Sequence, residues 1–164
     1  MNPPGTPGGD ADVVRILLPI DACDDSRWGI RYAIRRHRAG QRVEVILLNV
    51  GELISQWQVL RFYTEQELSR FQASSSKALI EDAAKPLREA NIPCRGVFKQ
   101  GEVAFAILDA AEELDCHEIA MPAPMTAWWN PFSSGVLLTV VKRQRSIPVF
   151  LVDRDGMPVK YPGH

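Results

Sequence analysis

The sequence has few of the features that mark secreted, membrane-spanning or nucleic-acid-binding proteins. Its three cysteines, Cys23, Cys94 and Cys116, form no CxxC pair, so the sequence predicts no disulfide framework, zinc site or redox dithiol. No apolar run approaches the roughly 18 residues of a membrane span, and the first ten residues lack a basic or apolar leader segment. The 19 Lys and Arg residues balance 20 Asp and Glu residues, which excludes a global attraction to nucleic acid or membrane. We therefore expect a cytoplasmic protein whose charged contacts are local.

Length and composition are those of one globular domain. The 164 residues are 46% hydrophobic and 24% charged, so the chain can bury a core. Proline and glycine crowd the start, and Asp155-Gly156 forms a turn signal near the end. These signals predict a disordered tail over residues 1–12, a domain over residues 13–153 and a C-terminal tail over residues 154–164.

Apolar runs and helical periodicity alternate along the domain. The runs predict strands over residues 13–20, 43–50, 92–98, 117–121 and 147–152, several of them apolar on both faces. Helical patterns follow the first strand as far as Gly40, start again at a capping box at Thr64 and run toward Asn91, and recur over residues 103–114. Residues 135–145 have strand propensity but a basic end that suits a helix, and we expect a helix there. The pattern predicts an α/β fold, a single-domain open parallel five-stranded sheet with helices on both faces.

In sheets of this kind, ligands bind beyond the carboxyl ends of the strands. The candidate site therefore comprises Asp21, the Gly101-Glu102 turn and the segment 122–135. The sequence contains no P-loop, no G-x-G-x-x-G dinucleotide motif, no H-E-x-x-H and no G-x-S-x-G. We expect no catalytic residues and no enzyme activity.

Four segments together resemble the universal stress protein family. They are Ile16-Leu-Leu-Pro-Ile-Asp21, the strand Val45 to Val50, Gly101-Glu102 before a helix, and Gly135 spaced thirteen residues before Pro148-Val149. The resemblance covers residues 13 to 153. It implies the fold shared by universal stress proteins and adenine nucleotide alpha-hydrolases, and a role in the stress response.

Family members that bind ATP carry a glycine motif after the fourth strand: Gly, two residues, Gly, nine residues, then Gly followed by Ser or Thr. On this chain the four positions are Pro122, Met125, Gly135 and Val136, of which only Gly135 matches. Asp21 ends the first strand as in the family.

Val50 occupies the adenine-side position of the second strand, so the nucleoside end of the site is better retained than the phosphate end. If a nucleotide binds, the resemblance implies cofactor contacts from Asp21, Val50, Gly135 and Val136. The cofactor would then be ATP or AMP.

The phosphate end lacks hydrogen-bond donors for a physical reason. Pro122 and Pro124 have no backbone N–H, and Val136 replaces a hydroxyl with methyl groups. Losing two or three bonds to phosphate, at roughly 1.5–3 kcal/mol each, lowers affinity by about two to six orders of magnitude. Trp128 and Trp129 are bulky enough to fill the vacated space. We expect a stress-response or regulatory binding module without tight ATP binding; the alternative is an adenine-nucleotide-binding member with weak or no ATPase activity.

Two charged clusters have alternative interpretations. Asp21, Asp24 and Asp25 could hold Mg²⁺ as in response-regulator receivers, but the chain lacks the other receiver residues, and helix capping explains the acids. We therefore expect no metal site. Five arginines in the first helix form either a solvated face or a surface for an unidentified partner, such as another protein, that is acidic or carries phosphate, which charge reversal at Arg31 and Arg35 would test.

The last predicted strand, Ile147 to Val152, is apolar and would lie at a sheet edge. Such an edge invites pairing. Relatives commonly pair this strand with its copy across a two-fold axis, so the resemblance implies a homodimer. The alternative is an edge covered by the C-terminal tail.

Overall fold

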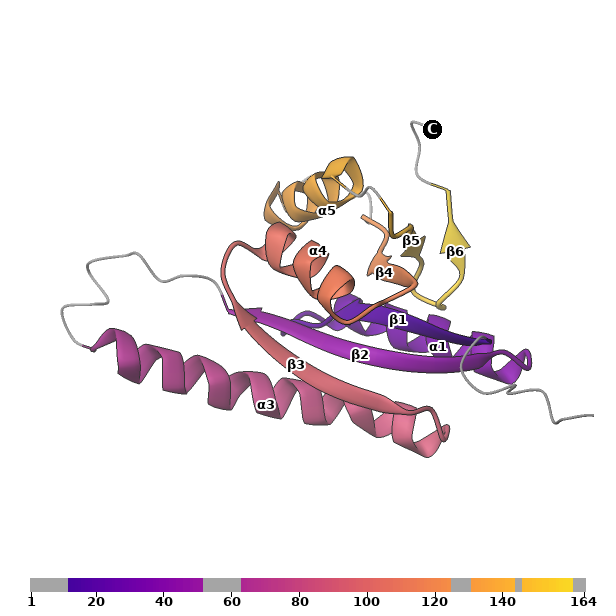
Figure 1. Ribbon diagram of the computed structural model, residues 1–164, viewed down its shortest axis with the longest axis horizontal. Coiled ribbons are helices and arrows are strands. Elements are labelled where there is room, and N and C mark those ends of the chain that lie inside the picture. Colours follow the sequence, from indigo (N-terminus) through magenta and orange to yellow (C-terminus); the bar gives the residue numbers. More distant parts are fainter. Residues whose placement is uncertain (1–11, 52–62, 125–130, 144–145, 161–164) are drawn as a thin grey trace, which may run out of the picture.

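The structure, a computed structural model, describes residues 12–51, 63–124, 131–143 and 146–160. Its core is one sheet in the order β3-β2-β1-β4-β5-β6, parallel except for the antiparallel pair β5–β6 (Figure 1). The strands are β1 (Val13–Pro19), β2 (Arg42–Gly51), β3 (Cys94–Gln100), β4 (Glu118–Pro122), β5 (Val149–Val152) and β6 (Pro158–Val159). The predicted α/β fold with a parallel sheet is confirmed.

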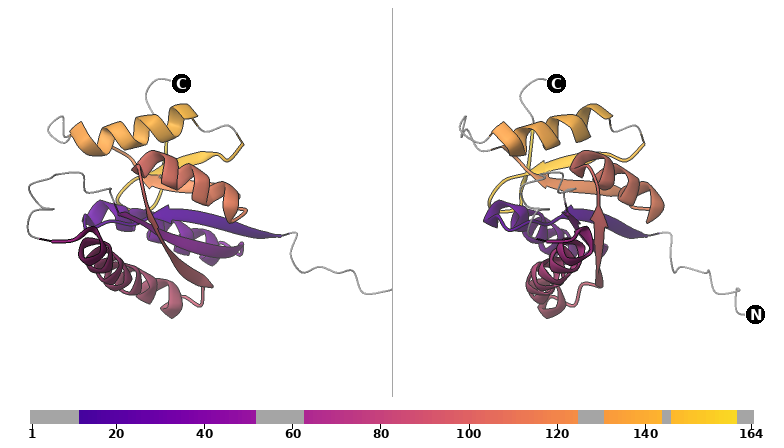
Figure 2. Two further views of the ribbon diagram at one scale, coloured as in Figure 1. Left: turned by 60° about the vertical axis from the view of Figure 1, so that its left-hand side comes forward. Right: turned by 90° about the vertical axis from the view of Figure 1, so that its left-hand side faces the viewer.

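Helices cover both faces of the sheet, as Figure 2 shows. The helices are the 3₁₀ turn η1 (Asp24–Arg27), α1 (Trp28–Arg38), α3 (Glu65–Glu89), α4 (Val103–Glu113) and α5 (Pro131–Arg143). α1 and α3 pack on one face, and α4 and α5 pack on the other. The switch of faces lies between the neighbouring strands β1 and β4.

The apolar strands are buried on both faces because each lies between two helix layers. In β1, Ile16 and Leu18 pack toward α1 and α3, whereas Leu17 packs toward α4 and α5. All three side chains are fully buried. Continuous apolar runs are the pattern expected of central parallel strands.

The long helix α3 begins as its sequence predicts. The Thr64 hydroxyl accepts a hydrogen bond from the Glu67 amide, and the Glu67 carboxylate accepts one from the Thr64 amide. These reciprocal bonds form the expected capping box. Pro86 lies inside the helix, which continues to Glu89 before Asn91 adopts a φ of 58°.

Two features differ from the sequence-based prediction by more than two residues. The last helix begins at Pro131 rather than Gly135, because proline is well suited to a first helical turn, where its missing N–H costs nothing. A sixth strand, β6, lies within the segment expected as a C-terminal tail. In the four described ranges, no helix is long and apolar enough to cross a membrane.

Candidate functional site

The candidate site lies at the carboxyl ends of β1, β2, β3 and β4. Because β1 leads to a helix on one face and β4 to a helix on the other, the chain diverges between these two adjacent strands. Open α/β sheets bind ligands in the crevice at such a switch point. The topology thus brings the segments after Ile20, Val50, Gln100 and Pro122 to one edge of the sheet.

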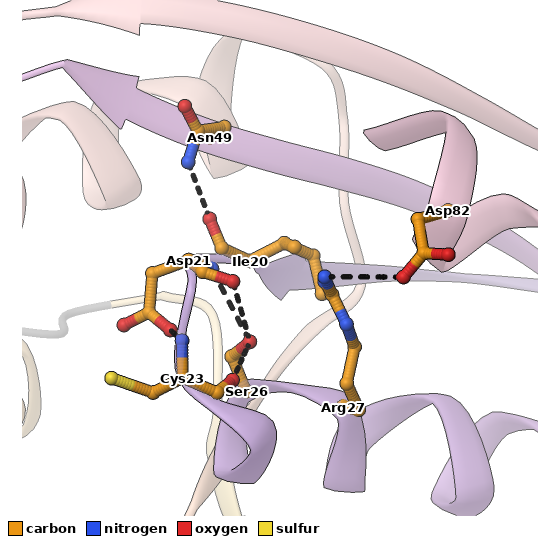
Figure 3. Close-up of polar contacts among 7 residues, drawn as sticks. All are labelled: Ile20, Asp21, Cys23, Ser26, Arg27, Asn49 and Asp82. Atoms are coloured by element: carbon orange, nitrogen blue, oxygen red, sulfur yellow. Dashed lines mark hydrogen bonds and ion pairs between the residues drawn. The ribbon is translucent and has the colours of Figure 1, made fainter. Parts of the chain in front are cut away.

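Asp21 opens the turn after β1 and is exposed. Its Oδ1 accepts a 2.7 Å hydrogen bond from the Cys23 amide (Figure 3). Ser26, only 6% exposed, lies beneath the turn, where its Oγ accepts from the Asp21 amide at 3.2 Å and donates to the Cys23 carbonyl at 2.8 Å. The turn is therefore fixed from inside by Ser26, which leaves the Asp21 carboxylate at the surface.

Hydrogen bonds connect the end of β2 to the end of β1. Asn49 Nδ2 donates a 2.7 Å hydrogen bond to the Ile20 carbonyl (Figure 3). The Ile20 amide in turn donates to the Leu48 carbonyl at 2.7 Å. Val50 is half-buried and packs against the core beneath α4 and α5. Sequence reasoning found Asp21 and Val50 but missed Ser26 and Asn49, whose partners are set by the tertiary fold.

The turn after β3 is hydrogen-bonded to the end of β2 at the carboxyl-terminal edge of the sheet. The Gly101 amide donates to the Gly51 carbonyl at 3.0 Å, which continues the β2–β3 pairing by one bond. Glu102 then caps α4 by accepting a 3.0 Å hydrogen bond from the Phe105 amide. Because its carboxylate occupies the helix N-terminus, that N-terminus is already neutralised by the chain itself.

The segment leaving β4 offers no free amide. Pro122 pairs with Val152 in the sheet, and the Ala123 amide donates to the Val152 carbonyl at 2.8 Å. Pro122 and Pro124 have no N–H. The one amide among these three residues is therefore used by the sheet.

Gly135 and Val136 lie inside α5 rather than at its start. They are the fifth and sixth residues of the helix, and from the fifth residue onward helical amides donate to carbonyls four residues earlier. Val136 is half-buried against the core. Met125, Trp128 and Trp129 lie outside the described residues.

Acidic groups concentrate around Asp21. One ligand atom from each of Asp21, Cys23 and Asp25 lies within 4.8 Å of the others. The Asp21 carboxylate, more than burial, raises the pKa of the Cys23 thiol, and burial followed by the Asp21 charge raises the pKa of the Asp25 carboxyl. Repulsion by the Asp21 charge is thus the main cause of the Cys23 shift and a secondary cause of the Asp25 shift, after burial. A cation would relieve that repulsion, but exposed acidic turns are common without one.

The structures similar to this chain share its fold at low sequence identity. The hypothetical protein MJ0577 is 24% identical with a TM-score of 0.65, over 86% of this chain and 96% of that one. A universal stress protein family member from Burkholderia pseudomallei is 14% identical with a TM-score of 0.66, over 88% and 98%. A family protein from Arabidopsis thaliana, solved with AMP bound, is 12% identical with a TM-score of 0.60, over 86% and 92%. Among curated proteins, none matches the sequence.

The sequence model of one family covers almost the whole described domain. The universal stress protein family model matches residues 13–152, from the first residue of β1 to the last residue of β5. The matched range includes every segment of the candidate site. The chain therefore belongs to the universal stress protein family.

Proposed function

We propose that this chain is a stress-response regulatory binding module of the cytoplasm that does not bind ATP tightly and is not an enzyme. The observation that carries this proposal is the absence of free donors in residues 122–124. Two of these residues are proline, and the amide of the third bonds to Val152 within the sheet. A phosphate chain needs several N–H donors and a helix N-terminus close together.

Among the described residues, the amides at two further motif positions and the N-terminus of α4 are also engaged. The amides of Gly135 and Val136 fall inside α5, where regular helical bonding uses them, and Val136 has no hydroxyl. Glu102 occupies the N-terminus of α4 and would repel a phosphate there. Each missing charge-assisted bond lowers affinity by roughly one to two orders of magnitude.

Calorimetry with ATP, AMP and adenosine tests the proposal. We expect no ATP binding in the micromolar range, and no gain in affinity from adenosine to ATP. A matched pair of variants, Asp21→Ala and Asp24→Ala, separates the site from the general acidity of the turn. Micromolar ATP binding that Asp21→Ala abolishes and Asp24→Ala leaves intact would refute the proposal.

A second candidate is an adenine-nucleotide-binding protein with weak or no ATPase activity. The exposed Asp21 carboxylate, held by a turn that Ser26 fixes, favours it, as does the half-buried Val50 on the adjoining strand. The AMP bound to the Arabidopsis protein supports the same candidate by family relationship alone. If adenosine, AMP and ATP bind with equal affinity, the site recognises the nucleoside but not the phosphates.

We further propose that two copies of the chain associate through β5. The strand is apolar, with Leu151 and Val152 buried, and it follows β4 at the side of the sheet away from β3. β6 is the outermost strand and pairs with Leu151 and Val152, so the edge of β5 is partly covered by the C-terminal segment, and a second copy can pair along the whole of β5 only if β6 leaves it. Sedimentation measurements on the full chain test this assembly directly.

A further inference from the structure

The chain continues from β5 into a hairpin that folds back on it. The Asp153 amide donates to the Met157 carbonyl at 2.9 Å, and Asp153 Oδ1 accepts bonds from the amides of Asp155 and Met157, both at 2.9 Å. This side chain organises the turn as an Asx motif. β6 then pairs antiparallel with β5, Pro158 opposite Val152 and Val159 opposite Leu151.

The hairpin turn is docked on helix α1 by two arginines. Arg31 donates from Nη1 to the Arg154 carbonyl, and Arg35 donates from Nε to the Asp155 carbonyl at 2.7 Å. Part of the basic face expected to be solvated or to bind a partner is therefore bonded to the chain's own C-terminal turn. The partners are backbone carbonyls more than 100 residues away, so no charge pattern could reveal them.

Gly156 lets the turn approach the helix backbone directly. It is buried, its φ is +78°, and a Cβ there would come within 2.5 Å of the Tyr32 nitrogen and 2.6 Å of the Arg31 carbonyl carbon. Both the conformation and the contact require glycine. The hairpin is thus a specific contact that one methyl group would disrupt.

The hairpin occupies part of the edge that a second copy would need. β6 covers Leu151 and Val152, two of the four residues of β5, on the side opposite β4 (Figure 1). While it is paired, no other strand can bond at those positions. Sheet proteins commonly protect an edge in this way.

β6 is short enough to dissociate from β5. β6 has only two residues, Pro158 has no N–H to give to the sheet, and Met157 and Val159 are 46% and 36% exposed. A strand with few bonds and little buried surface opens at low free energy.

We propose that the C-terminal hairpin, residues 153–159, is a releasable cover that controls the pairing of β5 with β5 of a second copy of this chain. The inference rests on the proposed dimer and adds its regulation. Release of the hairpin exposes the edge, and docking on Arg31 and Arg35 closes it.

The effect of the cover on association follows from mass action. Both copies must open, so the apparent dissociation constant equals the intrinsic constant divided by the square of the open fraction. A hairpin open in about one molecule in ten weakens association about a hundredfold. Variants that release it should tighten association by at least about tenfold.

Two full-length variants release the hairpin without changing β5. Gly156→Ala places a methyl group against the α1 backbone, and its control, Gly40→Ala, carries the same kind of strain at a φ of +94° with no atom within 4 Å. The double variant Arg31→Met/Arg35→Met removes the two side-chain donors. Its control, Arg38→Met, removes an exposed arginine from the same helix.

Hydrogen exchange at residues 151–159 reports release, and sedimentation equilibrium over a concentration series reports association. We expect faster exchange and at least about tenfold tighter association in both releasing variants, and no change in either control. If the wild type already dimerises as tightly as the variants, the hairpin does not control association, and this inference is wrong although the proposed dimer holds. If hydrogen exchange shows that the hairpin is released but the variants stay monomeric, both the hairpin inference and the proposed dimer are wrong. If exchange is unchanged, the contacts of Gly156, Arg31 and Arg35 do not hold the hairpin, and the inference is wrong.

Discussion

Tyr32 Oη donates a 2.8 Å hydrogen bond to Oε1 of Glu118, a residue that is only 6% exposed. Arg36 also bonds the same carboxylate oxygen, and its guanidinium donates to Tyr32 Oη at 2.9 Å. The three side chains join α1 to the first residue of β4. A carboxylate withdrawn from water needs such partners, because an unpartnered buried charge is strongly destabilising.

The first prediction follows from this cluster. Tyr32→Phe removes one donor from Glu118 and leaves Arg36 in place, so we expect the free energy of unfolding to fall by about 1–3 kcal/mol. Urea denaturation at neutral pH measures the change. Tyr63→Phe is the control, because Tyr63 is 57% exposed and its substitution should have little effect. Equal losses in the two variants would contradict the assignment.

Because of the Tyr32 hydroxyl, we also expect the free energy of unfolding to fall at alkaline pH. Burial, and then the hydrogen bond to Glu118, raise the pKa of Tyr32 from 10.0 to about 12. The folded state therefore holds this proton more tightly than the unfolded chain. The resulting stability is fully present below about pH 10 and is lost as the pH rises through about 12.

The difference in unfolding free energy between wild type and Tyr32→Phe isolates the titration of Tyr32, because the other groups that titrate at alkaline pH are present in both proteins. We expect wild type to lose its advantage progressively as the pH rises above about 10. Denaturation curves at a series of alkaline pH values provide the measurement. A difference that stays constant or grows would show that Tyr32 is not the responsible group.

The parts of the fold that were predictable are those set by local pattern. Ile16, Leu17 and Leu18 are all apolar, as expected of a strand between two helix layers, and all three are fully buried. Thr64 and Glu67 fix the start of α3 by bonds between neighbours in sequence. For the same reason, the alternation of strands and helices was sufficient to predict the α/β class.

The parts that could not be predicted depend on distant partners. β6 is two residues long and has no periodicity to detect, and it forms because Gly156 and Asp153 shape a turn that α1 holds. Asn49 and Ser26 are ordinary polar residues in the sequence, yet they position the strand ends around Asp21. Their roles come from spatial neighbours and not from spacing along the chain.

The cysteines should differ in reactivity in a defined order. The pKa of all three thiols is raised, that of Cys116 to about 11 by burial, but only Cys23 is exposed, whereas Cys94 is half-buried and Cys116 is buried. We therefore expect iodoacetamide to label Cys23 first at mildly alkaline pH, because the reagent can reach it, and Cys116 last, because it is buried and little of it is in the reactive thiolate form. Peptide mass spectrometry over a time course measures the order.

The turn after β1 provides a sharper test of the same chemistry. The Asp21 carboxylate is the largest cause of the raised pKa of Cys23, and Asp24 is the smallest. Asp21→Asn should therefore lower that pKa and speed labelling of Cys23 severalfold, while Asp24→Asn should change it much less. A larger effect from Asp24→Asn would mean that the electrostatics of the turn differ from those described.

Restoring the missing donors should restore phosphate binding. The variant Pro122→Gly/Met125→Gly/Val136→Ser supplies the glycines and hydroxyl of the ATP motif and leaves Asp21 and Val50 unchanged. One or two new charge-assisted bonds would raise ATP affinity by at least about tenfold. Adenosine is the control ligand, because it has no phosphate and its affinity should not move. Two outcomes would contradict this prediction: equal gains in affinity for adenosine and ATP, or a wild-type ATP affinity already as high as that of the variant. Either would show that the residues at positions 122, 125 and 136 do not limit phosphate binding.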